Sequence, residues 1–228
     1  MDKESVFLYY FKNMENIDAV IFDMDGVIFD SERITRIMWK KAGEEFNVKD
    51  VDSTVAEVTG RSFSDTCSYL KEKYGENFPA VEFRTRCSEL FHSYADKNGL
   101  PFMSEAKETL DYLKQKGYTL ALASSTRQAV VERELKQASI YDYFKTITCG
   151  DMVAHSKPDP EIYIKAAESL GADCHRCIAI EDSPNGIISS YRAGMMSVMV
   201  VDQIKPTEEL KKILYKLCYS LREVRSFL

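Results

Sequence analysis

Short apolar runs that end at polar or turn residues recur along the chain and predict the strands of a buried sheet. The runs cover residues 20–22, 118–123, 146–149, 177–180 and 197–201. A continuous apolar run of this length is typical of a strand that is covered on both faces. Amphipathic helical spacing fills the intervals, at residues 105–116, 127–138, 159–170 and 187–193. Strands that alternate with helices predict a parallel sheet with right-handed crossovers.

Residues 32–103 interrupt this alternation. Apolar residues recur there at helical spacing, as at Ile34, Ile37 and Met38, and no strand pattern stands out. A Gly-Arg-Ser break at residues 60–62 divides the stretch into two helix pairs. The sequence therefore predicts an α/β protein with a Rossmann-like core, residues 1–31 and 104–228, and an inserted α-helical cap domain, residues 32–103. Because the insert leaves the loop after the first strand, we expect it above the carboxyl edge of the sheet.

Composition places the chain among globular proteins and excludes some partners. Of its 228 residues, 45% are hydrophobic and 29% are charged, and the formal net charge is −6. A negative net charge argues against a nucleic-acid or anionic-membrane surface. No apolar run approaches the roughly 20 residues that a membrane span needs. We expect no nucleic-acid partner and no membrane partner, and the oligomeric state stays open between a monomer and a weak homodimer.

The N-terminus and the cysteines indicate a cytoplasmic location. Residues 6–11 are apolar but too few for a membrane span, and the acidic Asp2 and Glu4 argue against a signal peptide. Six scattered cysteines are too few for a disulfide scaffold, so we expect a reducing compartment. Cys174 and Cys177 have CxxC spacing, which fits either a redox pair or a chance pair in a loop.

The chemistry begins where the first strand ends. Asp23 and Asp25 follow the apolar run at i, i+2, so both side chains point to one side of the strand. The carboxyl ends of parallel strands form the ligand crevice of open α/β sheets. A carboxylate with an ordinary pKa is ionised at neutral pH, so Asp23 can act as a nucleophile, while Asp25 can protonate a leaving oxygen. The alternative is a solvated strand-to-turn pair.

Two further strand ends offer groups that suit a phosphate. Ser124, Ser125 and Thr126 combine hydroxyls with the N–H groups of a helix N-terminus, although the same residues also suit simple helix capping. Lys157 stands beside Pro158 in a backbone that two prolines restrain, which suits a fixed point charge. The alternative for Lys157 is an exposed loop lysine.

A fourth strand end adds two more acids. Glu181 and Asp182 follow the run at residues 177–180. Four carboxylates in one crevice repel one another unless a cation neutralises them, and oxygen ligands select a hard ion such as Mg²⁺. Acids that favour a helix N-terminus would explain this pair alone. They would not explain two acid pairs together with a lysine and a hydroxyl.

These stretches together resemble the four motifs of the haloacid dehalogenase superfamily. The matching residues are Asp23-Met24-Asp25-Gly26-Val27, Ser124, Lys157-Pro158 and Glu181-Asp182. Residues 29–32 and 181–187 look like the β-phosphoglucomutase-like branch, which has a helical cap. The resemblance covers nearly the whole chain after about residue 17 and implies the fold predicted above.

The resemblance also implies residue roles. Asp23 would form a phosphoaspartate and Asp25 would be the general acid and base. Ser124 and Lys157 would hold the phosphoryl oxygens. Mg²⁺ would be the cofactor. The expected metal-binding residues are Asp23, Asp25 through its carbonyl, Glu181 and Asp182.

The cap decides between a phosphatase and a mutase. The sugar-phosphate mutases that this chain resembles carry an arginine three residues after the glycine corresponding to Gly60, and a histidine on the first cap helix. The chain has Phe63 and Thr35 at these positions. Arg61 carries a bidentate anion-binding head on the same loop, with a solvated loop arginine as its alternative reading. The expected substrate-binding residues are Gly60, Arg61, Ser125 and Thr126.

We therefore expect Mg²⁺-dependent hydrolysis of a small phosphorylated metabolite, a sugar or polyol phosphate. An isomerase of the β-phosphoglucomutase type, which moves phosphate on a hexose phosphate through a bisphosphate intermediate, stays open if a cap cation binds the distal phosphate. A non-catalytic binding protein is disfavoured because all four acids are present. Departures from the family pattern at Arg33 and at residues 104–105 concern the hinges of the cap rather than the chemistry.

Overall fold

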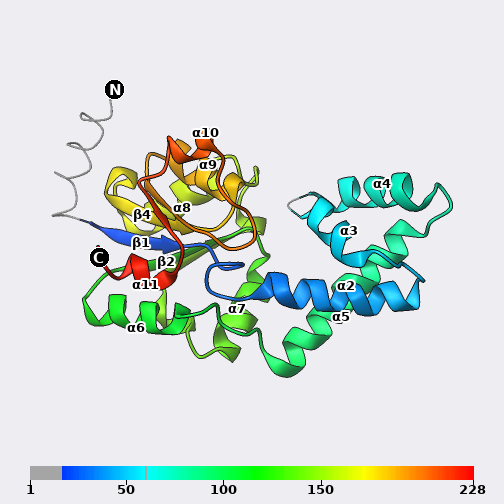
Figure 1. Cartoon of the computed structure of the whole chain (residues 1–228). Helices are drawn as coiled ribbons and strands as arrows, with labels where there is room; N and C mark the ends of the chain where they lie inside the picture. The colour runs from blue at the N-terminus through cyan, green and yellow to red at the C-terminus, as the bar shows by residue number, and fades with distance from the viewer. Residues whose placement is uncertain (1–16, 60) are drawn as a thin grey trace. The chain divides into compact units, whose positions relative to one another are not determined.

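The computed structural model describes residues 17–59 and 61–228 (Figure 1). The chain divides into two compact units. The first, called the core unit here, joins the described residues up to Asp30 with Pro101–Leu228. The second, Ser31–Leu100, is called the helical unit. Residues 1–16, which the predicted core domain includes, and Gly60, a predicted substrate-binding residue, lie outside the described residues.

The core unit is built on a six-stranded sheet in the order β3-β2-β1-β4-β5-β6. Every pair of neighbouring strands is parallel, and Ile21 of the central strand β1 stands between Ala121 of β2 and Ala179 of β4. The predicted α/β class with a parallel sheet is confirmed. The strands are β1 (Ala19–Phe22), β2 (Leu120–Ser124), β3 (Thr146–Cys149), β4 (Cys177–Glu181), β5 (Met196–Val200) and β6 (Lys216–Cys218).

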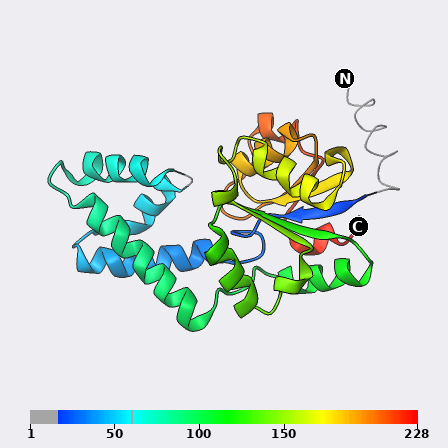
Figure 2. The same ribbon diagram turned by 180° about the vertical axis from the view of Figure 1, so that it is seen from behind.

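Helices cover both faces of this sheet. Figures 1 and 2 show α8 and α9 on one face and α6 and α11 on the other. The helices of the core unit are α6 (Ala106–Gln115), α7 (Gln128–Gln137), α8 (Glu161–Leu170), α9 (Pro184–Arg192), α10 (Glu208–Lys211) and α11 (Leu221–Val224). Short 3₁₀ turns are Tyr141–Tyr143, Gly150–Met152 and Cys174–Arg176.

Small side chains let α8 pack closely on the sheet. Ala166 and Ala167 of α8 share one buried cluster with Ala19, Ala121 and Ala179 from three strands. Because strand side chains alternate, the odd-numbered residues of β1 and β4 all face α8. The next odd-numbered positions are Asp23 and Glu181, so the same alternation that builds this core directs both acids to one side.

The structure differs from the predicted elements at the chain's C-terminal end and at one helix start. Strand β6 pairs with β5 beyond the last predicted strand, and its three residues are too short for a hydrophobic pattern to reveal it. Helix α9 begins at Pro184 rather than at residue 187, because Ser183 caps it by accepting a hydrogen bond from the Gly186 N–H at 3.0 Å.

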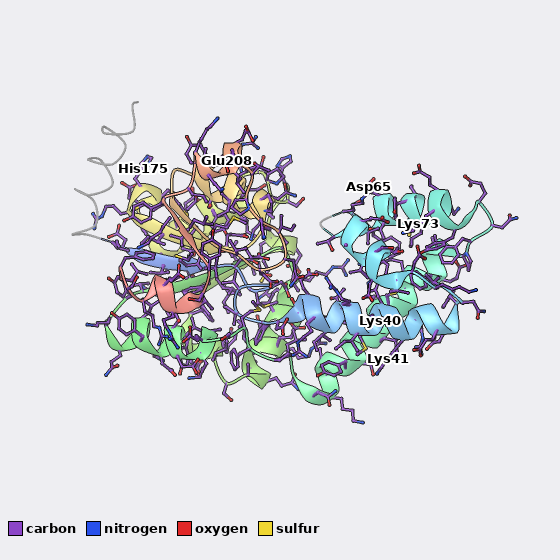
Figure 3. All side chains as sticks on the ribbon, in the orientation of Figure 1. Lys40, Lys41, Asp65, Lys73, His175 and Glu208 are labelled. Atoms are coloured by element: carbon purple, nitrogen blue, oxygen red, sulfur yellow. The ribbon has the colours of Figure 1, made fainter. Side chains whose placement is uncertain are left out.

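The helical unit has α2 (Ser31–Glu45), α3 (Val51–Val58), α4 (Phe63–Tyr74) and α5 (Ala80–Asn98). Its core surrounds Phe83, which is fully buried and meets Trp39 and Phe46 edge to face with ring centroids 5.4 Å apart. Charged side chains such as those of Lys40 and Asp65 are exposed on the outside of the helices (Figure 3). A buried aromatic centre with a charged exterior is the pattern of an independently packed helix bundle.

None of the helices within the described ranges is long and apolar enough to cross a membrane.

The aromatic centre of the helical unit gives the first prediction. Phe83→Ala should lower the free energy of unfolding by about 3–5 kcal/mol, because it leaves a cavity among rings that cannot collapse into it. Val81→Ala on the same helix is the control: Val81 is 52% exposed, and its change should stay within about 0.5 kcal/mol. Chemical denaturation of the two variants measures both values, and equal losses would contradict the packing described here.

Candidate active site

The first candidate residue, Asp23, lies directly after β1 at the carboxyl edge of the sheet. Its backbone N–H donates to the Ile180 carbonyl at 2.9 Å, which extends the β1–β4 pairing by one residue. Asp23 is 8% exposed, and its carboxylate accepts a hydrogen bond from Lys157 Nζ at 2.6 Å. The structure therefore brings together two predicted residues that are 134 positions apart in the chain.

The ammonium group of Lys157 has three hydrogen-bond acceptors in the core unit. It donates to Asp23 Oδ1 at 2.6 Å, to Glu181 Oε1 at 2.6 Å and to the Ala123 carbonyl at 3.0 Å. Burial by itself lowers the pKa of Lys157, but the charges of Asp23 and Glu181 outweigh burial and raise it. Lys157 is a fixed, permanently charged group rather than the exposed loop lysine that the sequence left as an alternative.

Glu181 is the anchor of this arrangement. Its side chain is 0% exposed, and Oε1 accepts hydrogen bonds from Lys157 and from the Tyr163 hydroxyl at 2.9 Å. Oε2 accepts from the Ser183 hydroxyl at 3.0 Å and from the backbone N–H groups of Asp182 and Ser183 at 3.2 Å. Two oxygens with five donors are close to saturation, so Glu181 serves chiefly to hold Lys157 in place.

Asp182 differs from its neighbour. Its carboxylate accepts no hydrogen bond from any residue in the described part of the chain, although it is largely buried. Burial, followed by the charges of Glu181 and Asp23, raises the pKa of Asp182 well above its usual range. A Cβ on Gly26 would lie 2.4 Å from Asp182 Oδ2, so glycine at this position leaves room for the carboxylate.

The acids fit a hard cation. Carboxylate oxygens of Asp23, Glu181 and Asp182 all lie within 4.8 Å of one another. Burial raises the pKa of Asp23 to about 7; Lys157 opposes this shift, and Glu181 and Asp25 add to it. The expectation that Asp23 has an ordinary pKa is therefore wrong for the metal-free protein. A buried, oxygen-only cluster with excess negative charge is the donor set that Mg²⁺ prefers.

Asp25 and the residues after β2 form the other side of the site. The Thr126 hydroxyl donates to Asp25 Oδ2 at 3.0 Å, and the Thr126 N–H donates to Ser124 Oγ at 3.1 Å. Ser124 is 1% exposed. Gly150 lies against this loop, since a Cβ there would be 2.1 Å from the Ser125 carbonyl. Of the predicted Ser124, Ser125 and Thr126, the structure brings Thr126 into direct contact with Asp25, whose carboxylate it orients.

The Asp25 carboxylate is outside the cluster of three acids that share a possible cation position. A metal contact through the Asp25 backbone carbonyl, as the resemblance implies, stays a prediction. The anchoring role of Tyr163 was not predicted. In the sequence, Tyr163 looks like an ordinary core residue of α8. Only the packing of α8 on the sheet shows that its hydroxyl contacts Glu181.

The loop that carries Lys157 is restrained by Glu161 at the start of α8. The Glu161 carboxylate accepts hydrogen bonds from the backbone N–H groups of Ala154 and His155 at 2.9–3.0 Å and pairs with Lys165. These contacts attach the part of the loop that precedes Lys157 to the start of α8.

The predicted cap residues lie in the helical unit. Gly60 is outside the described residues. Arg61 follows α3, with its guanidinium carbon 4.6 Å from the centre of the Tyr69 ring. Phe63 is the first residue of α4 and is 48% exposed, and Thr35 lies on α2.

The anchoring of Glu181 gives a prediction at Gly186. An added Cβ there would lie 1.8 Å from Glu181 Oε1, so Gly186→Ala must displace the carboxylate that holds Lys157. Alanine in place of a helical glycine normally stabilises, but here we expect a loss of about 1–3 kcal/mol in the free energy of unfolding. Thermal or chemical denaturation checks the sign. Asn185→Ala, at the exposed neighbouring position, is the control and should leave stability nearly unchanged.

The chain is similar to known hydrolases over most of its length. A model of the haloacid dehalogenase-like hydrolase family matches residues 20–200. YhcW of Bacillus subtilis is 32% identical over 200 residues, which cover 84% of this chain and 86% of the relative. Hexitol phosphatase B of Escherichia coli is 29% identical and covers 80% of this chain and 82% of its own. The phosphorylated carbohydrates phosphatase of Thermotoga maritima is 28% identical, with 78% and 82% covered.

Solved structures share the fold. A HAD family hydrolase from Deinococcus radiodurans, with bound phosphate and sodium, superposes with a TM-score of 0.78 at 25% identity and covers 93% of this chain and 98% of its own. The β-phosphoglucomutase of Clostridium difficile superposes with a TM-score of 0.69 at 24% identity, with 91% and 93% covered. The family match spans the core strands β1 to β5 and the intervening helices. The chain therefore belongs to the haloacid dehalogenase-like hydrolase family.

Proposed function

We propose that the chain is a Mg²⁺-dependent phosphatase that hydrolyses a small sugar or polyol phosphate through a phosphoaspartate on Asp23. The observation that carries this proposal is the bridge of Lys157 between Asp23 and Glu181 beside the acid Asp182, whose carboxylate has no hydrogen-bond partner in the described chain. A nucleophilic carboxylate, a fixed positive charge and a hard-cation site in one buried cluster suit phosphoryl transfer, which depends on positioning and on neutralising spread negative charge.

In the first half of the reaction, an oxygen of Asp23 bonds to phosphorus as the bond from phosphorus to the leaving oxygen breaks. Asp25, oriented by Thr126, gives its proton to that leaving oxygen, so the alcohol departs neutral. Lys157 stabilises the charge on the phosphoryl oxygens, and Ser124 offers a hydroxyl and the N–H groups after β2. Bound Mg²⁺ would supply Lewis-acid neutralisation of the phosphoryl charge, held by Asp23 and Asp182 with Glu181 behind them.

In the second half, Asp25 takes a proton from water, whose oxygen bonds to phosphorus while the bond to Asp23 breaks. The products are the alcohol and inorganic phosphate, and Asp23 and Asp25 return to their starting states. Asp23 must be ionised to attack. The raised pKa of Asp23 leaves its carboxylate only partly ionised at neutral pH, and a cation bound beside it would favour the ionised form that attacks.

The substrate class rests on two relatives that align with most of the chain. One is named for phosphorylated carbohydrates and the other for hexitol phosphates. Their alignments cover about four-fifths of each chain. Both names place the leaving group among polyhydroxylated carbon chains, which supports a sugar or polyol phosphate here.

Replacement of the proposed nucleophile tests the mechanism. Asp23→Asn should reduce phosphate release from sugar and polyol monophosphates by at least about 1,000-fold, because no covalent intermediate can form. Asp18→Asn is a matched control before the opposite end of β1, where Asp18 pairs with Arg176, and it should keep near-full activity. Removing metal with a chelator should abolish release by the unchanged protein, and Mg²⁺ should restore it.

Absence of release from every monophosphate would contradict the phosphatase proposal. Conversion of glucose 1-phosphate to glucose 6-phosphate with a bisphosphate primer would then establish the mutase alternative. Full activity of Asp23→Asn would remove Asp23 from the nucleophile's role.

A further inference from the structure

The helical unit encloses a small pocket of about 180 Å³. Side chains from all four of its helices and from the loop after α3 line it, among them Thr35, Trp39, Thr59, Arg61, Thr66 and Arg84. Pockets that hold drug-sized ligands measure roughly 300–1,000 Å³. The size of this pocket therefore suits one chemical group of a ligand rather than a whole sugar.

Arg84 is held in this pocket without a polar partner. Its guanidinium carbon lies 5.4 Å from the centre of the Trp39 ring and 5.9 Å from that of Phe63. Its Nε is buried and donates to no acceptor, and its side chain makes no ion pair within residues 17–59 and 61–228. Buried N–H donors are almost always satisfied, so an unpaired guanidinium nitrogen that borders a pocket points to a ligand.

Arg61 is the second arginine of the pocket, and it too pairs with no acid in the described ranges. Its guanidinium is stacked on Tyr69. The helical unit does have acids for other cations. Arg86, two positions along α5 from Arg84, pairs with Glu45 at 2.7 Å and with Glu89 at 3.3 Å. Within the described residues, the two arginines that line the pocket thus have no acid partner, whereas Arg86 beside them on α5 has two.

The side chains that line the pocket favour a negatively charged group of a ligand over a sugar ring. Trp39 is only 3% exposed and is covered by Arg84 and Phe83, so its ring has no open face for stacking. One acid, Glu32, stands against two guanidinium groups, and Thr35 and Thr59 add hydroxyls. Guanidinium groups bind carboxylate and phosphate oxygens in a bidentate way, and stacking on aromatic rings fixes them beforehand.

The position where related mutases carry an arginine is Phe63 in this chain, and Phe63 is instead one of the two rings that flank Arg84. We propose that Arg84 and Arg61 form an oxyanion-binding pocket in the helical unit, which holds a second anionic group, a phosphate or a carboxylate, of the substrate. The assignment to substrate rests on the proposed phosphatase function. It narrows the substrate class to phosphomonoesters whose remainder carries its own negative charge.

Trp39 provides a direct test, because it is the only tryptophan in the chain and lies against Arg84. Sulfate and malonate are titrated into the full-length protein at constant ionic strength while tryptophan fluorescence is recorded. We expect a saturable change in the unchanged protein and at least a tenfold weaker response in Arg84→Met. Arg86→Met is the matched control and should respond like the unchanged protein. A fluorescence change that does not saturate with anion concentration would contradict the proposal that the pocket binds oxyanions. An equal response in Arg84→Met would contradict it as well.

Arg84→Lys separates an anion-binding role of Arg84 from a packing role. This variant keeps the positive charge but loses the planar guanidinium group and its bidentate hydrogen bonds. An oxyanion site keeps part of its affinity in Arg84→Lys and loses it in Arg84→Met. A purely structural arginine gives two variants with lowered melting temperatures and unchanged anion binding, which overturns the proposal.

Kinetics test the assignment to substrate. Phosphate release is compared for a neutral sugar monophosphate and for one whose remainder carries a carboxylate or a second phosphate. We expect kcat/KM to favour the anionic substrate at least tenfold, and Arg84→Met to lose the preference through KM. No preference alongside anion binding would make the pocket a site for a free anion and overturn the substrate assignment.

The two proposals fail separately. A fluorescence response without phosphate release from any substrate would refute the phosphatase function and leave the pocket standing. Phosphate release without a fluorescence response would refute the pocket alone.

Discussion

The arrangement of the core unit depends on the ammonium group of Lys157, which bonds to two buried carboxylates and one carbonyl. Glu181 receives hydrogen bonds from Tyr163, Ser183 and two backbone N–H groups, so its position is fixed before any ligand arrives. Lys157 is positioned by Glu181 and in turn positions its charge beside Asp23. Breaking a buried charge set of this kind by removing one member costs several kcal/mol, which ties the stability of the fold to the geometry of the site.

The sheet supplies the rest of the geometry. Side-chain alternation sends Asp23 and Glu181 to the α8 face, where the alanines of β1, β2 and β4 let α8 approach. Tyr163 reaches Glu181 from that helix because the packing is close. Asp182, next in the chain after Glu181, accepts no hydrogen bond within the described chain, although one of its oxygens lies within 4.8 Å of those of Asp23 and Glu181. Two adjacent acids thus differ in how far neighbouring donors satisfy them.

Much of this could be predicted from the sequence. The parallel α/β class followed from apolar runs that alternate with amphipathic helices, and the acids at 23, 25, 181 and 182 followed from their places at strand ends. Tyr163 was not predictable, because a tyrosine on the buried face of a helix looks the same whether or not its hydroxyl has a partner. The raised pKa of Asp23 was also missed, since the burial and neighbouring charges that cause it come from distant segments. Strand β6 was missed because three residues are too few to show the alternation of apolar and polar side chains that identifies a strand.

The bond between Asp23 and Lys157 joins residues 134 positions apart, and the whole helical unit lies between them in the chain. During synthesis, β1 and the four helices of that unit leave the ribosome before Lys157 and β4 have been made. The helical unit has its own aromatic core, and it is made before β2 and β4, the two strands that pair with β1. The carboxylate of Asp23 therefore acquires its counter-charge only after the second half of the chain has been made, so the cluster of Asp23, Lys157 and Glu181 cannot form before β4 is available.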